Sequence, residues 1–513
     1  MLMNERKLSR RKFLQIMGMG GAALWVSSCL PKGLADSMFS QDAAAPSFEP
    51  DVEISLTAAP GEVNIFPDSK TSVWRYKGEV LRGSADVLES IPGSYLGPTL
   101  HLQKGQRVRV HFKNELPEPS IIHWHGLHVP EEADGHPRLA IDSGETYVYD
   151  FTVADRAGTY WYHPHPHGRT APQVYAGLAG LLLITDDEEA GLGLPSGEYD
   201  VPLVLQDRTF NSVDQLSYGG MGMMGQMTGF LGGRILVNGR PDHILPVKTH
   251  PYRLRLLNGS NSRIYKLAWQ DGVPMVVLGT DGGLLEKPVE RSFITLAPAQ
   301  RIDLWVDFSS YAMGETRQMV SLPFAALGGE AAYPLFAAQI EEVIDHSVTL
   351  PDQLSHITWH VAEDAVNRKS PRSFQLAMGR GMQWTLNGRV FDMHSVAKDE
   401  IVRLGDLEIW EFENLAGSGM GMMGGMNLPH PMHVHGLQFQ VIERQISSAG
   451  LAAWQTLGEG FVDEGWHDTV LVMPGEKVKV LLKFENFTGL YLYHCHNLEH
   501  EDMGMMRNYR VDA

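Results

Sequence analysis

The segment Ile141-Asp-Ser-Gly-Glu-Thr-Tyr-Val-Tyr-Asp-Phe151 decides the fold, because two later stretches of the chain repeat it. The same turn and alternating strand return as Leu296-Ala-Pro-Ala-Gln-Arg-Ile-Asp-Leu-Trp-Val-Asp-Phe308 and as Val472-Met-Pro-Gly-Glu-Lys-Val-Lys-Val-Leu-Leu-Lys-Phe484. Alternation of polar and apolar residues is typical of a half-buried β-strand. Copies that lie so far apart in the sequence indicate homologous β units and exclude a short-period solenoid.

The rest of the chain agrees with an all-β fold. Short alternating runs such as Arg107–Phe112 are separated by turn signals such as Asn238-Gly239 and Asn387-Gly388. At 513 residues the chain is too long for one hydrophobic core. We therefore predict three consecutive β-sandwich or β-barrel domains, which cover residues 50–190, 195–348 and 355–513.

A second repeat occurs only twice. Gly158-Thr-Tyr-Trp-Tyr-His-Pro-His165 matches Gly489-Leu-Tyr-Leu-Tyr-His-Cys-His496, and the middle unit has no copy. The first and third domains are therefore predicted to carry the chemistry, with the middle domain as a spacer.

Ten histidines gather in four short motifs, a pattern that indicates a metal site. The motifs are His123-Trp-His125-Gly126, His163-Pro-His165, His430-Pro-Met-His433-Val-His435-Gly436 and His494-Cys495-His496-Asn-Leu-Glu-His500. In a strand, residues i and i+2 point to the same face, so each His-x-His pair presents two imidazoles side by side. Four such pairs suffice for about three metal ions, but imidazole alone does not distinguish copper from zinc, iron or nickel.

The cysteine narrows the choice of metal. Cys29 lies in the N-terminal leader, so Cys495 is the one thiol expected in the mature chain and cannot form an internal disulfide. Cys495, His430 and His500, with Met505 as a weak axial ligand, match the donor set of a blue-copper electron-transfer site. A zinc site at His-Cys-His and a purely structural use of the histidines are the alternatives.

These motifs resemble those of the multicopper oxidase family, over essentially all of the chain after its leader. The resemblance implies three cupredoxin domains, four copper ions, and oxidation of a substrate coupled to reduction of dioxygen to water. It implies a type 1 copper bound by His430, Cys495, His500 and Met505, a type 2 copper bound by His123 and His433, and a type 3 pair bound by His125, His163, His165, His435, His494 and His496. His167 follows the second motif and would be an outer or structural residue.

The resemblance also assigns two acids and an electron path. Asp134 and Glu501 match the positions from which family members deliver protons to the oxygen-reducing cluster. Cys495 would pass electrons to that cluster through its neighbours His494 and His496.

Methionine-rich segments suggest the substrate. They contain Met221, Met223, Met224 and Met227, and Met420, Met422, Met423 and Met426. Their glycine content opposes both helix and strand, and thioethers prefer Cu(I). The chain therefore resembles the bacterial copper-efflux oxidases, which oxidise Cu(I). Residues 417–429 hold no carboxylate, however, and Asp392 is the candidate elsewhere.

The same residues are compatible with other functions. A general laccase that oxidises phenols or aromatic amines is the main alternative, and oxidation of manganese or iron is another. A copper-free cupredoxin scaffold and a copper-storage protein are the non-enzymatic alternatives, but the scaffold would lack the ligands and storage would not need the His-Cys-His arrangement.

The N-terminus predicts export. Ser9-Arg10-Arg11-Lys12-Phe13-Leu14 resembles a twin-arginine motif, and the apolar run 16–26 behind it is too short to span a bilayer. Cleavage after Ala35 would release a periplasmic monomer, whereas lipidation of Cys29 would attach it to a membrane. The net charge of −19 argues against nucleic acid as a partner.

Overall fold

The computed structural model describes residues 48–219, 222–345, 348–379, 381–415 and 427–513. The predicted leader with Cys29 lies outside the described residues, as do Met221, Met420, Met422, Met423 and Met426, and the side chains of Met223 and Met224 are not described. Residues 49–513 form one unit. Within the described ranges, no helix is both long and apolar enough to cross a membrane.

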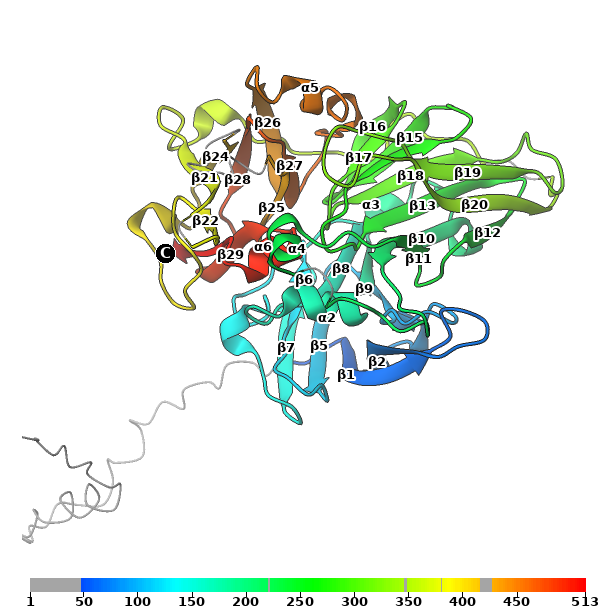
Figure 1. Ribbon diagram of the computed structural model, residues 1–513, viewed down its shortest axis with the longest axis horizontal. Helices are drawn as coiled ribbons and strands as arrows, with labels where there is room; N and C mark the ends of the chain where they lie inside the picture. Colours follow the sequence, from blue (N-terminus) through cyan, green and yellow to red (C-terminus); the bar gives the residue numbers. More distant parts are fainter. Residues whose placement is uncertain (1–47, 220–221, 346–347, 380, 416–426) are drawn as a thin grey trace, which may run out of the picture. The chain divides into compact units, whose positions relative to one another are not determined.

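The described chain folds into six β-sheets, two in each third of the sequence (Figure 1). In the first third, one sheet has the order β2 (Thr71–Arg82), β1 (Val52–Val63), β5 (Arg107–Asn114), β7 (Thr146–Thr152). The other has the order β3 (Leu88–Glu89), β4 (Thr99–Gln103), β9 (Gly180–Thr185), β8 (Gly158–Pro164), β6 (Ile122–His125). Alternate residues of β1 and β5 are buried, because they face the core between the two sheets.

The middle third repeats this plan. Its first sheet has the order β11 (Arg234–Val237), β10 (Asp200–Arg208), β13 (Pro251–Asn258), β18 (Arg301–Asp307), β15 (Met275–Thr280), β16 (Gly283–Arg291). Its second has the order β12 (His243–Lys248), β20 (Tyr333–Glu342), β19 (Thr316–Ser321), β14 (Tyr265–Trp269), β17 (Ile294–Leu296). A separate buried cluster of apolar side chains lies between them.

The last third also forms two sheets around its own apolar cluster. One has the order β22 (Trp384–Leu386), β21 (Arg372–Met378), β24 (Leu407–Asn414), β28 (Glu476–Lys483), β26 (Phe439–Ile446). The other has the order β23 (Ile401–Arg403), β30 (Met506–Asp512), β29 (Gly489–Cys495), β25 (His430–Val434), β27 (Thr469–Val472). The all-β prediction is confirmed.

Both sequence repeats occupy equivalent places in the sheets. The thrice-repeated segment forms β7, β18 and β28, which pair antiparallel with β5, β13 and β24. Strands β5, β13 and β24 in turn run parallel to β1, β10 and β21, which come first along the chain in their sheets. The twice-repeated segment forms β8 and β29, and the strand in the same place of the middle third is β19, Thr-Arg-Gln-Met-Val-Ser, which carries no histidine.

The helices are short. The α-helices among the described residues are α2 (Thr170–Ala176), α3 (Asp187–Ala190), α4 (Gly222–Thr228), α5 (Leu451–Trp454) and α6 (Leu498–Asp502). The expectation that the first methionine segment would avoid a helix was wrong, because α4 lies within it. Tertiary contacts override the low helix propensity of glycine here, since α4 packs on α6 (Figure 1).

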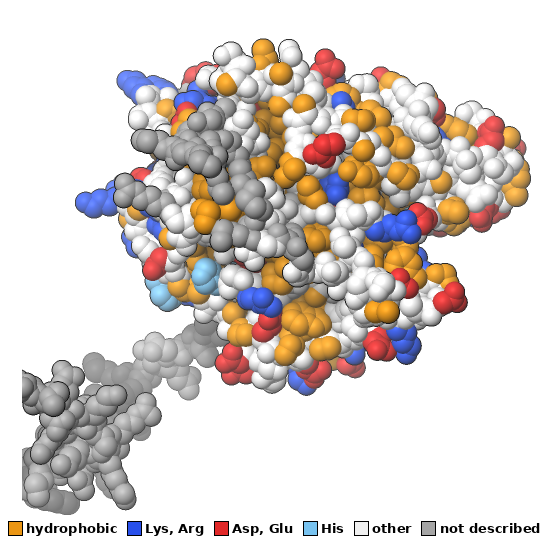
Figure 2. Space-filling view, viewed as in Figure 1, with side chains coloured by type: hydrophobic (Ala, Val, Ile, Leu, Met, Phe, Trp, Pro, Cys, Tyr) orange, Lys and Arg blue, Asp and Glu red, His pale blue; other side chains and the backbone are white. Residues whose placement is uncertain are grey.

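Charged groups join the thirds of the chain where their sheets meet. Arg253 on β13 forms a buried ion pair with Asp303 on β18 and a second pair with Glu189 on α3, which is partly exposed. Thr159 on β8 donates to Asp303, with 2.8 Å between Oγ1 and Oδ1, so the first and middle thirds share one polar network. On the face shown in Figure 2, acidic and basic side chains are interspersed with apolar ones and do not form a single charged field.

Candidate metal centre

Strand β29 places a thiol and two imidazoles on opposite sides of one backbone. Alternation sends His494 and Cys495 to opposite faces of the sheet, and His496, which follows the strand, returns to the face of His494. Strand β25 pairs antiparallel with β29, with Met432 opposite Cys495 and His433 opposite His494. The pairing therefore brings histidines of two motifs to each face.

On one face, Cys495 meets His430 and His500. The Cys495 Sγ atom lies 3.5 Å from His430 Nδ1 and 3.7 Å from His500 Nδ1, and the two nitrogens are 3.2 Å apart. All three side chains are buried and close enough to hold one ion. Burial raises the pKa of the Cys495 thiol, so a bound cation is what would favour the thiolate at this position.

Met505 lies in the same buried cluster as Cys495. Its amide donates to the carbonyl of His500 at 2.9 Å, and its own carbonyl accepts from the Cys495 amide at 3.0 Å. Met505, the predicted thioether ligand, is thus joined by backbone hydrogen bonds to Cys495 and His500, two of the other three predicted ligands.

Helix α6 presents His500 to this site. Its N-cap residue, Asn497, accepts a hydrogen bond from the His500 amide through Oδ1 at 3.3 Å. The Asn497 amide donates to Cys495 Sγ at 3.4 Å, which stabilises negative charge on the sulfur. The outer nitrogen of His500, Nε2, donates to the carbonyl of Met227 on α4 at 3.0 Å.

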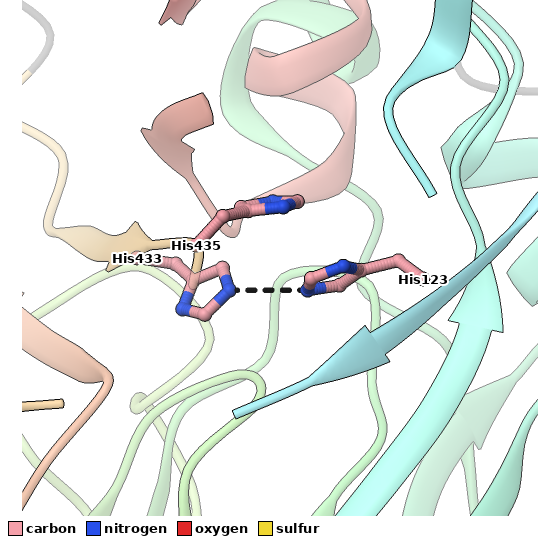
Figure 3. A group of neighbouring side chains, drawn as sticks. All are labelled: His123, His433 and His435. Atoms are coloured by element: carbon pink, nitrogen blue, oxygen red, sulfur yellow. Dashed lines mark hydrogen bonds between the residues drawn. The ribbon is translucent and has the colours of Figure 1, made fainter. Parts of the chain in front are cut away.

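On the other face, eight histidines form one buried group between the first and last thirds of the chain. They are His123 and His125 from β6, His163 from β8, His165 just after it, His433 from β25, His435 just after it, His494 from β29, and His496 just after it. Figure 3 shows His123 pointing toward His433 and His435, with 3.3 Å between the Nε2 atoms of His123 and His433. The structure therefore brings together the eight residues that the sequence predicted.

The outer ring nitrogen of five of these histidines is bound to an acceptor. Nδ1 lies 2.6 Å from Asp134 O in His123, 3.0 Å from Pro164 O in His163, 2.8 Å from Asp468 O in His433, 2.9 Å from Asp134 Oδ2 in His435, and 3.1 Å from Cys495 O in His494. An acceptor at Nδ1 places the ring proton there and leaves the Nε2 lone pair toward the centre of the group. This is the usual outer support of metal-bound histidine.

The inner nitrogens fit metal ions better than they fit one another. His435 Nε2 and His165 Nε2 lie 3.0 and 3.3 Å from His494 Nε2, although the tautomers of His435 and His494 leave no proton between their two nitrogens. In the described part of the chain, His125 Nδ1, His163 Nε2, His165 Nδ1 and both ring nitrogens of His496 are buried without a hydrogen-bond partner. Buried polar atoms are rarely left unpaired, so these point to cations as their partners.

Burial also keeps the group in its neutral, ligating form. Removal from water lowers the pKa of His163 to about 4 and that of His165 to about 3. Burial and neighbouring imidazoles lower the pKa values of five more of these histidines well below the ordinary range: His123, His125, His433, His435 and His496. The donor set therefore fits copper, which imidazoles bind when uncharged.

Sequence reasoning missed Asp468, which supports two of the histidines. Its carbonyl holds His433, and its Oδ1 atom lies 2.9 Å from His125 Nε2, which directs the other nitrogen of His125 inward. Arg301 from the middle third binds both carboxylate oxygens of Asp468, at 2.9 and 2.6 Å. Arg301 begins strand β18 within a repeated segment, but nothing in that pattern indicates a partner so far along the chain.

Both predicted proton-relay acids lie beside the histidine group. Asp134 is buried, burial raises its pKa well above the ordinary value, and its Oδ1 has no hydrogen-bond partner among the described residues. Glu501 is buried on α6, with Oε2 3.2 Å from His494 Nδ1 and Oε1 3.6 Å from His165 Nε2. Each acid thus touches ligands predicted for the cluster.

Two other predicted residues, His167 and Asp392, lie apart from the two groups. His167 is exposed and packs against Phe391, with 5.0 Å between ring centroids. Asp392 is exposed at a turn, where Oδ1 accepts from the amides of His394 and Ser395. Met227 is buried, with its carbonyl at His500.

Comparison with known proteins identifies the family. Two family models described as multicopper oxidase match residues 74–189 and 365–513. The chain is 33% identical over 440 residues to the multicopper oxidase mco of Staphylococcus aureus, covering 85% of this chain and 86% of that protein. It is 30% identical over 471 residues to a laccase of Bacillus subtilis, covering 81% of this chain and 88% of that protein. The McoA multicopper oxidase of Aquifex aeolicus has a crystal structure that matches with a TM-score of 0.77 and 36% identity, over 91% of this chain and 97% of that one.

The chain therefore belongs to the multicopper oxidase family, as the sequence motifs predicted. Membership implies bound copper, a reducing substrate and dioxygen, and it agrees with the three-domain cupredoxin fold.

The third histidine of the motif His163-Pro-His165-Pro-His167 gives a direct test of the ligand register. We expect His163→Ala to lower the copper content of the purified protein, because the Nε2 atom of His163 lies in the buried group. His167→Ala is the matched control and should keep full copper content, since His167 is exposed. Elemental analysis of the two variants measures this, and equal copper loss from both would contradict the assignment.

Proposed function

We propose that this chain is a cuprous oxidase, which takes single electrons from Cu(I) at the site of His430, Cys495 and His500 and uses them to reduce dioxygen at the eight-histidine group. Met505 would be the axial ligand of the first site. When bound, one copper ion at the first site and three at the second would supply the electron transfer and oxygen chemistry. The observation that carries the substrate assignment is the position of α4 against His500.

Helix α4 covers the side of His500 that faces away from Cys495. The carbonyl of Met227 accepts from His500 Nε2 at 3.0 Å and from Trp384 Nε1 at 3.1 Å. The ring centroids of Trp384 and His500 lie 4.5 Å apart. An organic donor would therefore meet α4 and Trp384 before it met the imidazole, whereas Met227 of α4 carries a thioether, a donor suited to Cu(I).

The backbone of β29 would connect the two sites. Cys495 would relay electrons from the first site to its sequence neighbours His494 and His496, which lie in the eight-histidine group. The connection is covalent, so it needs no motion of the protein.

Asp134 and Glu501 would supply protons. Reduction of dioxygen to two waters consumes four electrons and four protons, and a positioned carboxyl can deliver them. Asp134 holds His435 and Glu501 approaches His494, so each acid reaches the group through a different histidine.

We also propose that the chain has three domains, at residues 50–190, 195–348 and 355–513. Each pair of sheets falls within one of these ranges. We also propose export by the twin-arginine route, on the motif at 9–14, as a monomer.

A laccase acting on phenols is the second candidate. It is favoured by the 30% identity to the laccase of Bacillus subtilis. In a cuprous oxidase α4 would help to bind the electron donor, whereas in a laccase α4 would block the access of the donor to His500.

Replacement of a single thioether distinguishes the two candidates. We expect Met227→Leu, a change that conserves volume, to lower kcat/KM for Cu(I) by about tenfold and to leave that for a phenol unchanged. Met319→Leu is the matched control, because Met319 is equally buried in the middle core. Steady-state oxygen uptake with each donor is the measurement, and equal loss on both donors would contradict a cuprous site at α4.

Removal of either acid should slow oxygen reduction without loss of copper. Asp134→Asn keeps an oxygen for His435 Nδ1 but holds no transferable proton, and Glu501→Gln acts likewise. We expect kcat to fall by about 100-fold in each, with copper content and blue colour retained. Stopped-flow reoxidation by dioxygen measures the step, and an unchanged rate would remove the acid from the mechanism.

A further inference from the structure

We propose that Glu499 is a positioning residue that holds the segment of α4 against the copper ligand His500, and that it thereby sets both the reduction potential of that site and the donors that reach it. The inference rests on the proposed function of the Cys495 site as the point of electron entry. Glu499 lies one residue before His500 and was not among the residues predicted from the sequence.

The carboxylate of Glu499 is buried and accepts four hydrogen bonds. Oε1 accepts from Tyr218 Oη at 2.8 Å and from Asn261 Nδ2 at 2.8 Å. Oε2 accepts from the Phe230 amide at 3.0 Å and from Ser262 Oγ. All four donors belong to the middle third of the chain, and Tyr218 and Phe230 lie on either side of α4.

The four donors are uncharged, and among the described residues no Lys or Arg forms an ion pair with Glu499. A buried carboxylate without a cation is costly, and only donors in fixed positions offset that cost. The bonds of Glu499 therefore specify one arrangement of Tyr218 and of residues 222–230 on α6, which an apolar side chain at position 499 would not do.

A second residue of α6 fixes the same segment. Asn497 Nδ2 donates to the Thr228 carbonyl at 3.5 Å, and Asn497 Oδ1 lies 3.0 Å from the Oγ atom of Ser262, whose one proton is donated to Glu499. Gly229 has a φ of +96°, and a Cβ there would lie 2.4 Å from Ser262 Oγ and 2.5 Å from Asn497 Nδ2. The close fit at Gly229 places the carbonyl of Met227 at His500 Nε2.

That carbonyl affects the chemistry of the copper ligand. An acceptor on the outer nitrogen makes a metal-bound imidazole more electron-donating, which stabilises the oxidised metal and lowers its reduction potential. If the segment moves away, the potential should rise and the imidazole edge should become open to organic donors. Glu499 would then act on specificity through α4, without touching the substrate.

The test is Glu499→Gln in the copper-loaded protein. The amide keeps the size of the side chain but retains one acceptor oxygen, so two of the four donors lose their partner. We expect a higher reduction potential at the blue site, faster hydrogen exchange of the α4 amides, and a roughly tenfold rise in the ratio of phenol to Cu(I) kcat/KM. Glu476→Gln is the matched control, because Glu476 is a buried, hydrogen-bonded glutamate in the last third, bound to Arg444 and Trp454.

A second variant acts on the middle third and leaves α6 unchanged. Gly229→Ala should displace the same segment by steric contact and give the same three changes. An unchanged potential and unchanged α4 exchange in both variants would overturn the inference, and so would equal changes in Glu476→Gln. If the wild-type protein does not oxidise Cu(I), the proposed substrate is wrong. The reduction potential and the hydrogen-exchange rates of the variants would still decide the role of Glu499.

Discussion

The antiparallel pairing of β25 with β29 is the interaction on which both metal groups depend. Its register sets His433 opposite His494 and Met432 opposite Cys495. A shift of one residue would send each of these side chains to the other face of the sheet. The thiol would then face the histidine group, and the two sites would no longer share one short stretch of backbone. The apolar cluster around Cys495 and Met432 fixes this register.

The middle third of the chain supports the metal groups without supplying predicted ligands to the eight-histidine group. Its strand β19 stands in the place of β8 and β29 but has no histidine. Arg301 holds Asp468, which in turn orients His125 and His433. The segment around α4 contacts His500 from the other side. The unit predicted as a spacer thus positions both sites through hydrogen bonds.

Residue patterns predicted the features that depend on local periodicity. The repeat ending at Phe151 gave the all-β plan, and the His-x-His spacing placed paired imidazoles on one face because strand alternation is strictly local. Asp468 and Glu499 could not be found in this way, since their partners come from other domains and their spacing in the sequence is uninformative. Helix α4 was missed because glycine-rich segments acquire regular structure only through tertiary contacts.

Electron transfer between the two sites depends on the sulfur of Cys495, which would bind copper and conduct electrons to the eight-histidine group. Visible absorption and electron paramagnetic resonance of the copper-loaded protein, compared with Cys495→Ser, test it most directly. We expect an intense blue sulfur-to-copper band that the serine variant loses, while the copper bound by the eight histidines remains. A wild-type protein without that band, or a serine variant that keeps it, would show that Cys495 does not bind copper in this way.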